Sequence, residues 1–124
     1  MLREIASKLK EILALSPADR SATVNGPTID TQGLSALLFV FNVGALTTVD
    51  GSNYFSLIIE ESDNGSSWTT YSTVKELKAA GDADKVYSGS YGGNKRYARA
   101  SGVETGTSVA LFGAVALGAL QHQP

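Results

Sequence analysis

The stretch from Leu34 to Val43, LSALLFVFNV, constrains the fold of this chain more than any other. It is continuously apolar and rich in aromatic and branched side chains, which is typical of a central strand buried on both faces. Further strand-like runs cover residues 53–61, 67–74, 85–91, 94–101 and 108–120, and residues 21–29 alternate weakly. About seven short strands at this spacing, separated largely by glycine-bearing turns, predict an all-β sandwich or barrel.

The first residues have a different pattern. Within residues 2–15, apolar side chains recur at helical spacing, with charged residues on the opposite side. The members of this stripe are Leu2, Ile5, Leu9 and Ile12. The pattern predicts an N-terminal amphipathic α-helix that ends before Pro17, because proline cannot continue a helix. Such a helix either packs on its own domain or forms an arm that reaches a neighbouring subunit.

The domain organisation follows from these patterns. In a chain of 124 residues we expect an N-terminal helix or arm over residues 1–16 and one β-sandwich domain over 17–120. We expect residues 121–124 to form a flexible tail, which carries the only histidine, His122, with no second imidazole as a partner. A formal net charge of −2 argues against nucleic-acid binding, and the lack of cysteine excludes disulfides and thiolate metal sites.

Two apolar segments bear on membranes and packing. The N-terminal segment is broken by Lys8, Lys10 and Glu11 and does not read as a signal peptide. The longest uncharged apolar run, Val109–Leu120, is shorter than the roughly 20 residues of a membrane span, so we expect no membrane association. As a strand, this run has alanine and glycine along most of one side. We expect that smooth side to be covered by the sister sheet or by another chain.

The acidic cluster EESDNGSSW is the first candidate for chemistry. Glu60 and Glu61 are adjacent, so in a strand they point to opposite faces and cannot act as an acid/base pair. An EF-hand alignment fails because Tyr71 occupies the position of the bidentate glutamate, although a looser surface calcium site stays open. The cluster is better interpreted as the tip of a β-hairpin.

The predicted hairpin turn is centred on Asp63, Asn64 and Gly65, with Trp68 packed nearby. Asn-Gly favours a tight turn in which both central residues have positive φ. Asp63 is expected to accept hydrogen bonds from backbone N–H groups of the turn.

A second cluster, KRYAR, places basic and aromatic side chains together on one predicted strand. Lys95, Tyr97 and Arg99 share one face, and Arg96 lies on the other. Three interpretations stay open: a solvent-facing strand whose arginines pair with acidic residues at 60, 61 or 84, the polar rim of a protein interface, or a nucleic-acid surface.

The order of these features resembles a group of small structural proteins of tailed bacteriophages. The resemblance covers roughly Ala18 to Leu120. Its strongest pieces are Phe41–Gly44, Glu60–Trp68, Lys95–Arg99 and Thr105–Thr107.

The resemblance implies an antiparallel, jelly-roll-like β-sandwich and a non-enzymatic role as a capsid cement or decoration protein. Such proteins bind the major capsid protein on the virion surface, commonly as homotrimers, and this one would be made in the host cytoplasm. No catalytic residue, metal or cofactor is implied. The expected interface residues are Leu2, Ile5, Leu9, Ile12, Lys95, Arg96 and Arg99. Deletion of residues 1–15 is then predicted to abolish shell binding.

Two other roles stay open at this point. The chain could belong to the neck, tail or spike base of a virion. It could also be a carbohydrate- or host-surface-binding module, in which Trp68, Tyr54 and Tyr71 would form an exposed aromatic platform.

Overall fold

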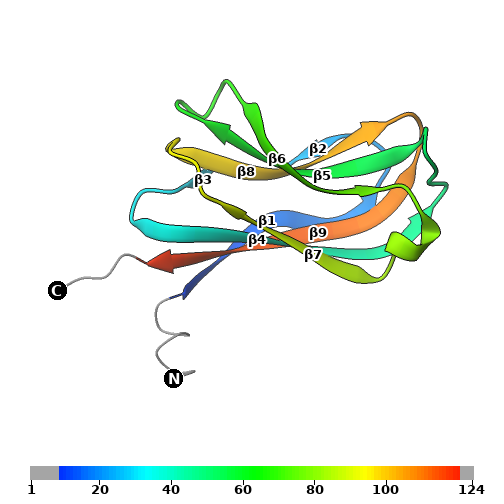
Figure 1. Cartoon of the computed structure of the whole chain (residues 1–124), viewed down its shortest axis with the longest axis horizontal. Helices are drawn as coiled ribbons and strands as arrows, with labels where there is room; N and C mark the ends of the chain where they lie inside the picture. The colour runs from blue at the N-terminus through cyan, green and yellow to red at the C-terminus, as the bar shows by residue number, and fades with distance from the viewer. Residues whose placement is uncertain (1–8, 121–124) are drawn as a thin grey trace.

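The structure, a computed structural model, describes residues 9–120 and consists of two stacked antiparallel β-sheets (Figure 1). Sheet A, the lower layer in this view, has the strand order β1-β9-β4-β7. Its strands are β1 (Leu9–Arg20), β9 (Val109–Leu120), β4 (Leu34–Thr47) and β7 (Lys85–Tyr91). The predicted all-β class and antiparallel sandwich are confirmed.

Sheet B has the order β2-β8-β5-β6, and the short strand β3 also pairs with β8. Its strands are β2 (Val24–Asn25), β3 (Ile29–Asp30), β8 (Tyr97–Thr105), β5 (Tyr54–Ser62) and β6 (Thr69–Leu77). A short 3₁₀ turn, η1 (Ala80–Asp82), precedes β7.

The connections follow jelly-roll topology when β2 and β3 are taken as two halves of one interrupted strand. With that pair counted once, the chain alternates between the sheets at every step except the β5–β6 hairpin. Each sheet then has four strands, and apart from the β5–β6 hairpin the neighbouring strands are distant in sequence, as in the double-sheet jelly rolls found among viral capsid and lectin domains.

The prediction of an N-terminal helix is wrong for the part of it that the structure describes, residues 9–16. Residues 9–20 form strand β1, which pairs with β9 along most of its length. An isolated helix of this length is marginal in water, whereas pairing with β9 buries Ala14 and Leu15 and covers an apolar strand edge. Pro17 is tolerated because β1 is an edge strand and its register shifts between Leu15 and Ala18.

The core lies between the sheets and is rich in aromatic side chains. Phe39 and Phe41 from β4 are fully buried, and Phe112 from β9 packs edge-on against Phe55 from β5, with ring centroids 5.2 Å apart. Leu57 and Ile59 face the same interior, because alternate residues of a strand point to the same side. These large side chains meet the small alanines of β9, so the expectation that the smooth side of β9 is covered by the sister sheet is confirmed.

Strand β4 departs from its predicted burial. It is central in sheet A, between β9 and β7, but only one of its faces is buried. Leu37 is almost fully enclosed, whereas Leu38 and Asn42 on the opposite face are exposed. A continuous apolar run therefore places apolar side chains on the outside of the sandwich as well as inside it.

Candidate interaction surface

The acidic cluster forms the β5–β6 hairpin, as predicted, but its turn differs from the predicted type. Gly65 has a φ of 76°, in the left-handed region, whereas Asn64 does not lie there. The expectation that both central residues have positive φ is therefore wrong. The side chain of Ser62 stabilises the turn instead. Its hydroxyl accepts hydrogen bonds from the backbone N–H groups of Asn64 (3.2 Å) and Gly65 (2.9 Å).

Asn64 stabilises the second half of the turn. Its Oδ1 accepts hydrogen bonds from the backbone N–H groups of Ser66 (2.8 Å) and Ser67 (2.9 Å). The expected role of Asp63 as the acceptor is wrong, since its carboxylate instead binds Lys95 Nζ at 2.9 Å. Serine and asparagine are both common side-chain caps of turns, which is the signal that could have identified this arrangement.

Arg99 lies in a compact polar cluster on the outer face of sheet B. Its Nε donates a hydrogen bond of 2.8 Å to Glu60 Oε1, and the two side chains are only 17% and 14% exposed. The hydroxyl of Ser101 donates to the same oxygen at 2.7 Å. The guanidinium also lies over the ring of Trp68, 4.2 Å from its centroid. The predicted pairing of an arginine with Glu60 is confirmed for Arg99.

Lys95 and Arg96 form two further ion pairs within the chain. Arg96 donates to both carboxylate oxygens of Asp30, at 3.2 and 2.9 Å, and this contact lowers the pKa of Asp30 below its usual value. The hydrogen bond with Asp63 raises the pKa of Lys95. All three predicted rim cations are thus neutralised by acidic groups of the same chain. Their role in an interface stays a prediction.

Glu60 and Glu61 point to opposite faces, as the strand alternation predicts. Glu61 Oε1 accepts a hydrogen bond of 2.8 Å from the hydroxyl of Tyr91, which reaches across from sheet A. Burial, together with this carboxylate contact, raises the pKa of Tyr91 to about 12. Within residues 9–120, no group of three or more histidine, aspartate or glutamate side chains is placed to hold a metal ion.

The three aromatic residues of the possible carbohydrate platform have separate partners. Trp68 contacts Arg99, and the ring of Tyr54 lies 4.5 Å from Lys78 Nζ. Tyr71 packs edge-on against the ring of Tyr91, and its hydroxyl accepts a hydrogen bond from a backbone N–H. Each ring is therefore already engaged within the molecule.

The outer face of sheet A has the opposite character. Four side chains on it are large, apolar and substantially exposed: Val86 (61%), Leu13 (54%), Val115 (44%) and Leu38 (37%). They come from all four strands of the sheet, and Val40 and Leu117 lie among them. We call these six residues the apolar face. A contiguous exposed apolar surface of this kind typically marks an interaction site.

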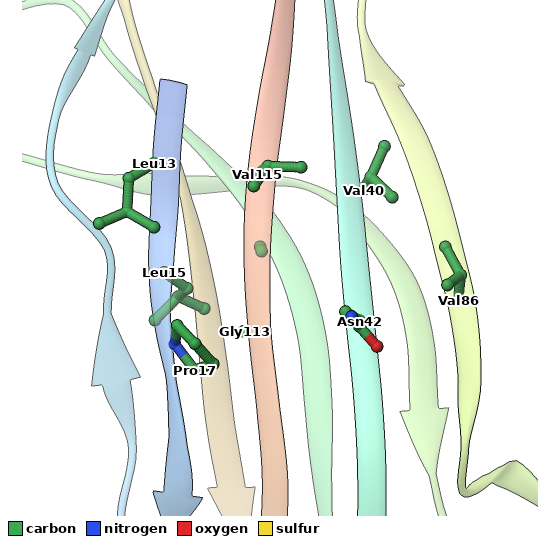
Figure 2. Close-up of a pocket in the computed structure, with 9 residues that line it drawn as sticks. Leu13, Leu15, Pro17, Val40, Asn42, Val86, Gly113 and Val115 are labelled. Atoms are coloured by element: carbon green, nitrogen blue, oxygen red, sulfur yellow. The ribbon is translucent and has the colours of Figure 1, made fainter. Parts of the chain in front are cut away.

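A groove of about 210 Å³ crosses the apolar face (Figure 2). Figure 2 shows Leu13, Val115 and Val40 side by side on neighbouring strands, with Gly113 and Asn42 next along the sheet. None of its lining residues is charged. They are Leu13, Leu15, Pro17, Val40, Asn42, Val86, Gly113, Ala114 and Val115.

The register shift of β1 between Leu15 and Ala18, which we call the β1 bulge, requires a glycine on the neighbouring strand in this groove. A Cβ atom on Gly113 would lie only 2.8 Å from Pro17 Cα and 2.9 Å from its nitrogen. The lack of a side chain at this position therefore allows the bulge to pack against β9, and it leaves a hollow beside Val115.

The predicted apolar interface residues are divided by the structure. Leu2 and Ile5 lie outside the described residues, as does His122. Leu9 and Ile12 lie on β1, where Ile12 is partly buried against the core. Sequence reasoning did not identify Leu13 and Val86 as surface residues. The sequence signal for the apolar face lay in β4 alone: apolar residues occupy both sides of this strand, so burial of one side leaves Leu38 and Val40 on the other.

Within residues 9–120, no helix has the length and apolar character needed to cross a bilayer.

No protein-family model matches the chain, and no curated protein matches it. Among solved structures, the chain is similar to the phage protein XepA, the exported protein of PBSX. The TM-score is 0.63 at 20% identity, over 93% of this chain and 38% of XepA. The chain thus spans well under half the length of XepA, and its predicted resemblance to phage proteins is confirmed for the fold.

Two structures of infectious bursal disease virus are also found. The VP2 subviral particle gives a TM-score of 0.34 at 11% identity, over 94% of this chain and 41% of the other. The Gt strain gives 0.30 at 11% identity, over 94% and 42%. These scores are too low to indicate a common fold.

Proposed function

We propose that this chain is a non-enzymatic virion structural protein, a cement or decoration protein that bridges neighbouring subunits of a phage head. The apolar face is the observation that carries this proposal. It offers exposed leucine and valine side chains on a four-stranded sheet, whereas Lys95, Arg96 and Arg99 on the opposite sheet are paired with carboxylates of the same chain. The jelly-roll order and the similarity to a phage protein support the same role.

The proposed contact with the major capsid protein lies on sheet A rather than at Lys95, Arg96 and Arg99. Transfer of the apolar face out of water supplies binding energy, at about 25 cal/mol per Å² of apolar surface. Each ion pair would have to be broken or desolvated before its cation could bind another protein, which offsets the gain. A protein that binds only the assembled shell stabilises that shell by mass action, and many weakly bound copies act together.

A binding assay with purified heads of the phage that encodes this chain tests the proposal. Saturable binding of the wild type is expected, together with a higher temperature of head disruption. Val115→Glu places a charge in the apolar face and is expected to weaken binding at least tenfold, about 1.4 kcal/mol. The matched control is Thr70→Glu, an exposed position on the outer side of sheet B.

Circular dichroism and urea unfolding of both variants show that they are folded before binding is compared. Absence of saturable binding by the wild type contradicts the cement role. Equal weakening by Val115→Glu and Thr70→Glu contradicts the assignment of sheet A as the contact surface. Deletion of residues 1–15 is a poor substitute, because it removes more than half of strand β1.

A further inference from the structure

Within the part of the chain that the structure describes, each sheet has two edges, and three of these four edges are protected against pairing with another chain. Strand β1 carries Pro17 and shifts register twice along β9. Strand β6 shifts register twice along β5 and carries Lys75 and Glu76. At the other edge of sheet B, β2 and β3 have two residues each and are interrupted by Gly26 and Pro27. Short strands, proline, bulges and charges are the usual means by which natural proteins block edge pairing.

The fourth edge, strand β7, has none of these features. It pairs with β4 over all seven of its residues without a register shift. It contains no proline and carries a single charge, at Lys85. Within residues 9–120 its only strand partner is β4, so the other side of its backbone is free. On its outer face Val86, Ser88 and Ser90 are all exposed. A flat, regular edge of this kind is a template for a further strand.

The sequence of β7 indicates which strand would pair with it. Its last five residues read YSGSY, the same in both directions. We propose that β7 pairs antiparallel with β7 of a second copy of this chain, about a two-fold axis at Gly89. Tyr87 then lies opposite Tyr91 of the other copy. In the same way, Ser88 lies opposite Ser90 of the other copy. Each pair joins two residues of the same type, and a two-fold interface requires this kind of self-complementarity.

This register also places compatible side chains on each face. The serine hydroxyls meet on the outer face, where cross-strand hydroxyl pairs form hydrogen bonds, and the tyrosines meet on the side of the core. Lys85 is four residues from Gly89, so the two copies of Lys85 lie about 27 Å apart, at opposite ends of the new ladder. A strand from another protein could form the same backbone hydrogen bonds, but only a second copy makes use of the symmetric sequence.

The pairing would join two four-stranded sheets into one sheet of eight strands. Residues directly opposite each other in a ladder point to the same face, so the apolar faces of the two copies lie on the same side of the joined sheet. The pairing is a property of the isolated protein and does not rest on the proposed function. Where both hold, one pair presents a contact surface two copies wide to neighbouring subunits of a head.

Sedimentation equilibrium of the full-length protein tests the pairing. The wild type is expected to form dimers with a dissociation constant below about 1 mM. Ser88→Asp with Ser90→Asp places like charges directly opposite each other and is expected to raise this constant about tenfold. Ser88→Lys with Ser90→Lys is expected to have the same effect, whereas an equimolar mixture of the two variants should dimerise at least as tightly as the wild type. The matched control is Ser16→Asp with Ser21→Asp, two exposed serines at the opposite edge of sheet A.

Circular dichroism and urea unfolding first establish that each variant is folded. A wild type that stays monomeric up to about 1 mM, or that forms trimers, overturns the proposal. An equal loss of dimers in the control variant also overturns it. So does failure of the mixture to restore dimers, because opposite charges at these positions should attract across the proposed ladder. These measurements need no phage heads, so they can fail or succeed independently of the head-binding assay.

Disulfide formation tests the register of the pair. Because the chain has no cysteine, Ser88→Cys and Ser90→Cys each introduce a single thiol. Under mild oxidation an equimolar mixture is expected to form the disulfide between positions 88 and 90 about threefold faster than either variant forms one with itself, because directly opposite residues are within disulfide range and diagonal ones are about 7–8 Å apart. Mass spectrometry identifies the products. Equal rates overturn the two-fold axis at Gly89.

Discussion

On both sheets every second residue points outward, but the outward residues differ: those of sheet B are largely charged and paired, and those of sheet A are largely apolar and exposed. On sheet B, Glu60 and Arg99 form a hydrogen-bonded pair at 2.8 Å and are mostly shielded from water. On sheet A, the corresponding outward positions carry Val115 and Leu38, which are substantially exposed and have no polar group to engage. One face is internally satisfied, and the other retains apolar surface that a partner can bury.

We expect the outer face of sheet B to contribute mainly to folding stability and the outer face of sheet A mainly to binding. A paired carboxylate contributes to the folded state because its loss leaves the other charge partly buried and unpaired. An exposed valine contributes little to folding, because much of its surface stays in water in both states. Changes on sheet B should therefore act mainly on unfolding, and changes on sheet A mainly on binding.

The largest expected effect is on the polar face. Glu60→Ala removes the acceptor of both Arg99 and Ser101, and we expect the free energy of unfolding to fall by about 1–3 kcal/mol. Urea unfolding at neutral pH measures the loss. A double-mutant cycle with Arg99→Ala isolates the pair, and independent, additive losses would contradict the coupling.

A smaller effect is expected where the two sheets are linked by a polar contact. Tyr91→Phe removes the hydrogen bond to Glu61, with a loss of about 1 kcal/mol at neutral pH. In the folded protein the pKa of Tyr91 is raised to about 12 from an ordinary value near 10. A raised pKa means that the folded state holds the proton more tightly, so the added stability is present below pH 10 and is lost as pH rises towards 12.

Urea unfolding of the wild type and Tyr91→Phe at several pH values between 8 and 12 checks this. The difference between the two proteins should shrink above about pH 10. The other tyrosines are common to both proteins, so their ionisation cancels in the comparison. A difference that stays constant with pH would show that the contact with Glu61 does not shift the titration.

The smallest expected effect is on the apolar face. Val115→Thr keeps the shape of a side chain that is 44% exposed, and we expect the free energy of unfolding to change by no more than about 0.5 kcal/mol. Urea unfolding beside Glu60→Ala gives the direct comparison of the two faces. A loss as large as that of Glu60→Ala would show that the apolar face supports the fold and would remove the distinction drawn between the sheets.

Much of the fold could be predicted from local patterns. Strand alternation in residues 53–61 puts Phe55, Leu57 and Ile59 on one face, which the structure buries, and Lys85–Tyr91 has the predicted bounds. The hairpin tip was also recognisable, but its hydrogen bonds were not. Asn-Gly indicates a turn, whereas the choice between backbone geometry and capping by Ser62 depends on how β5 and β6 twist together.

The N-terminal part shows why local pattern can mislead. Leu9 and Ile12 fit a helical stripe, and Ile12 and Ala14 fit an inward-facing strand equally well. The choice depended on β9, almost 100 residues further along the chain, whose apolar edge needs a hydrogen-bonded partner. Short apolar segments often leave this ambiguity, because helical and strand periodicities overlap over a few residues.

By itself, the sequence determined the all-β class, the lack of cysteine chemistry and the alternation that divides core from surface. These follow from residue type and spacing, which act over a few neighbouring residues. Only the tertiary structure decided that β1 is a strand, that Arg96 pairs with Asp30, and that one side of β4 is left outside as part of the apolar face. Each depends on which distant strands become neighbours, and that is fixed by burial of the whole core rather than by any local pattern.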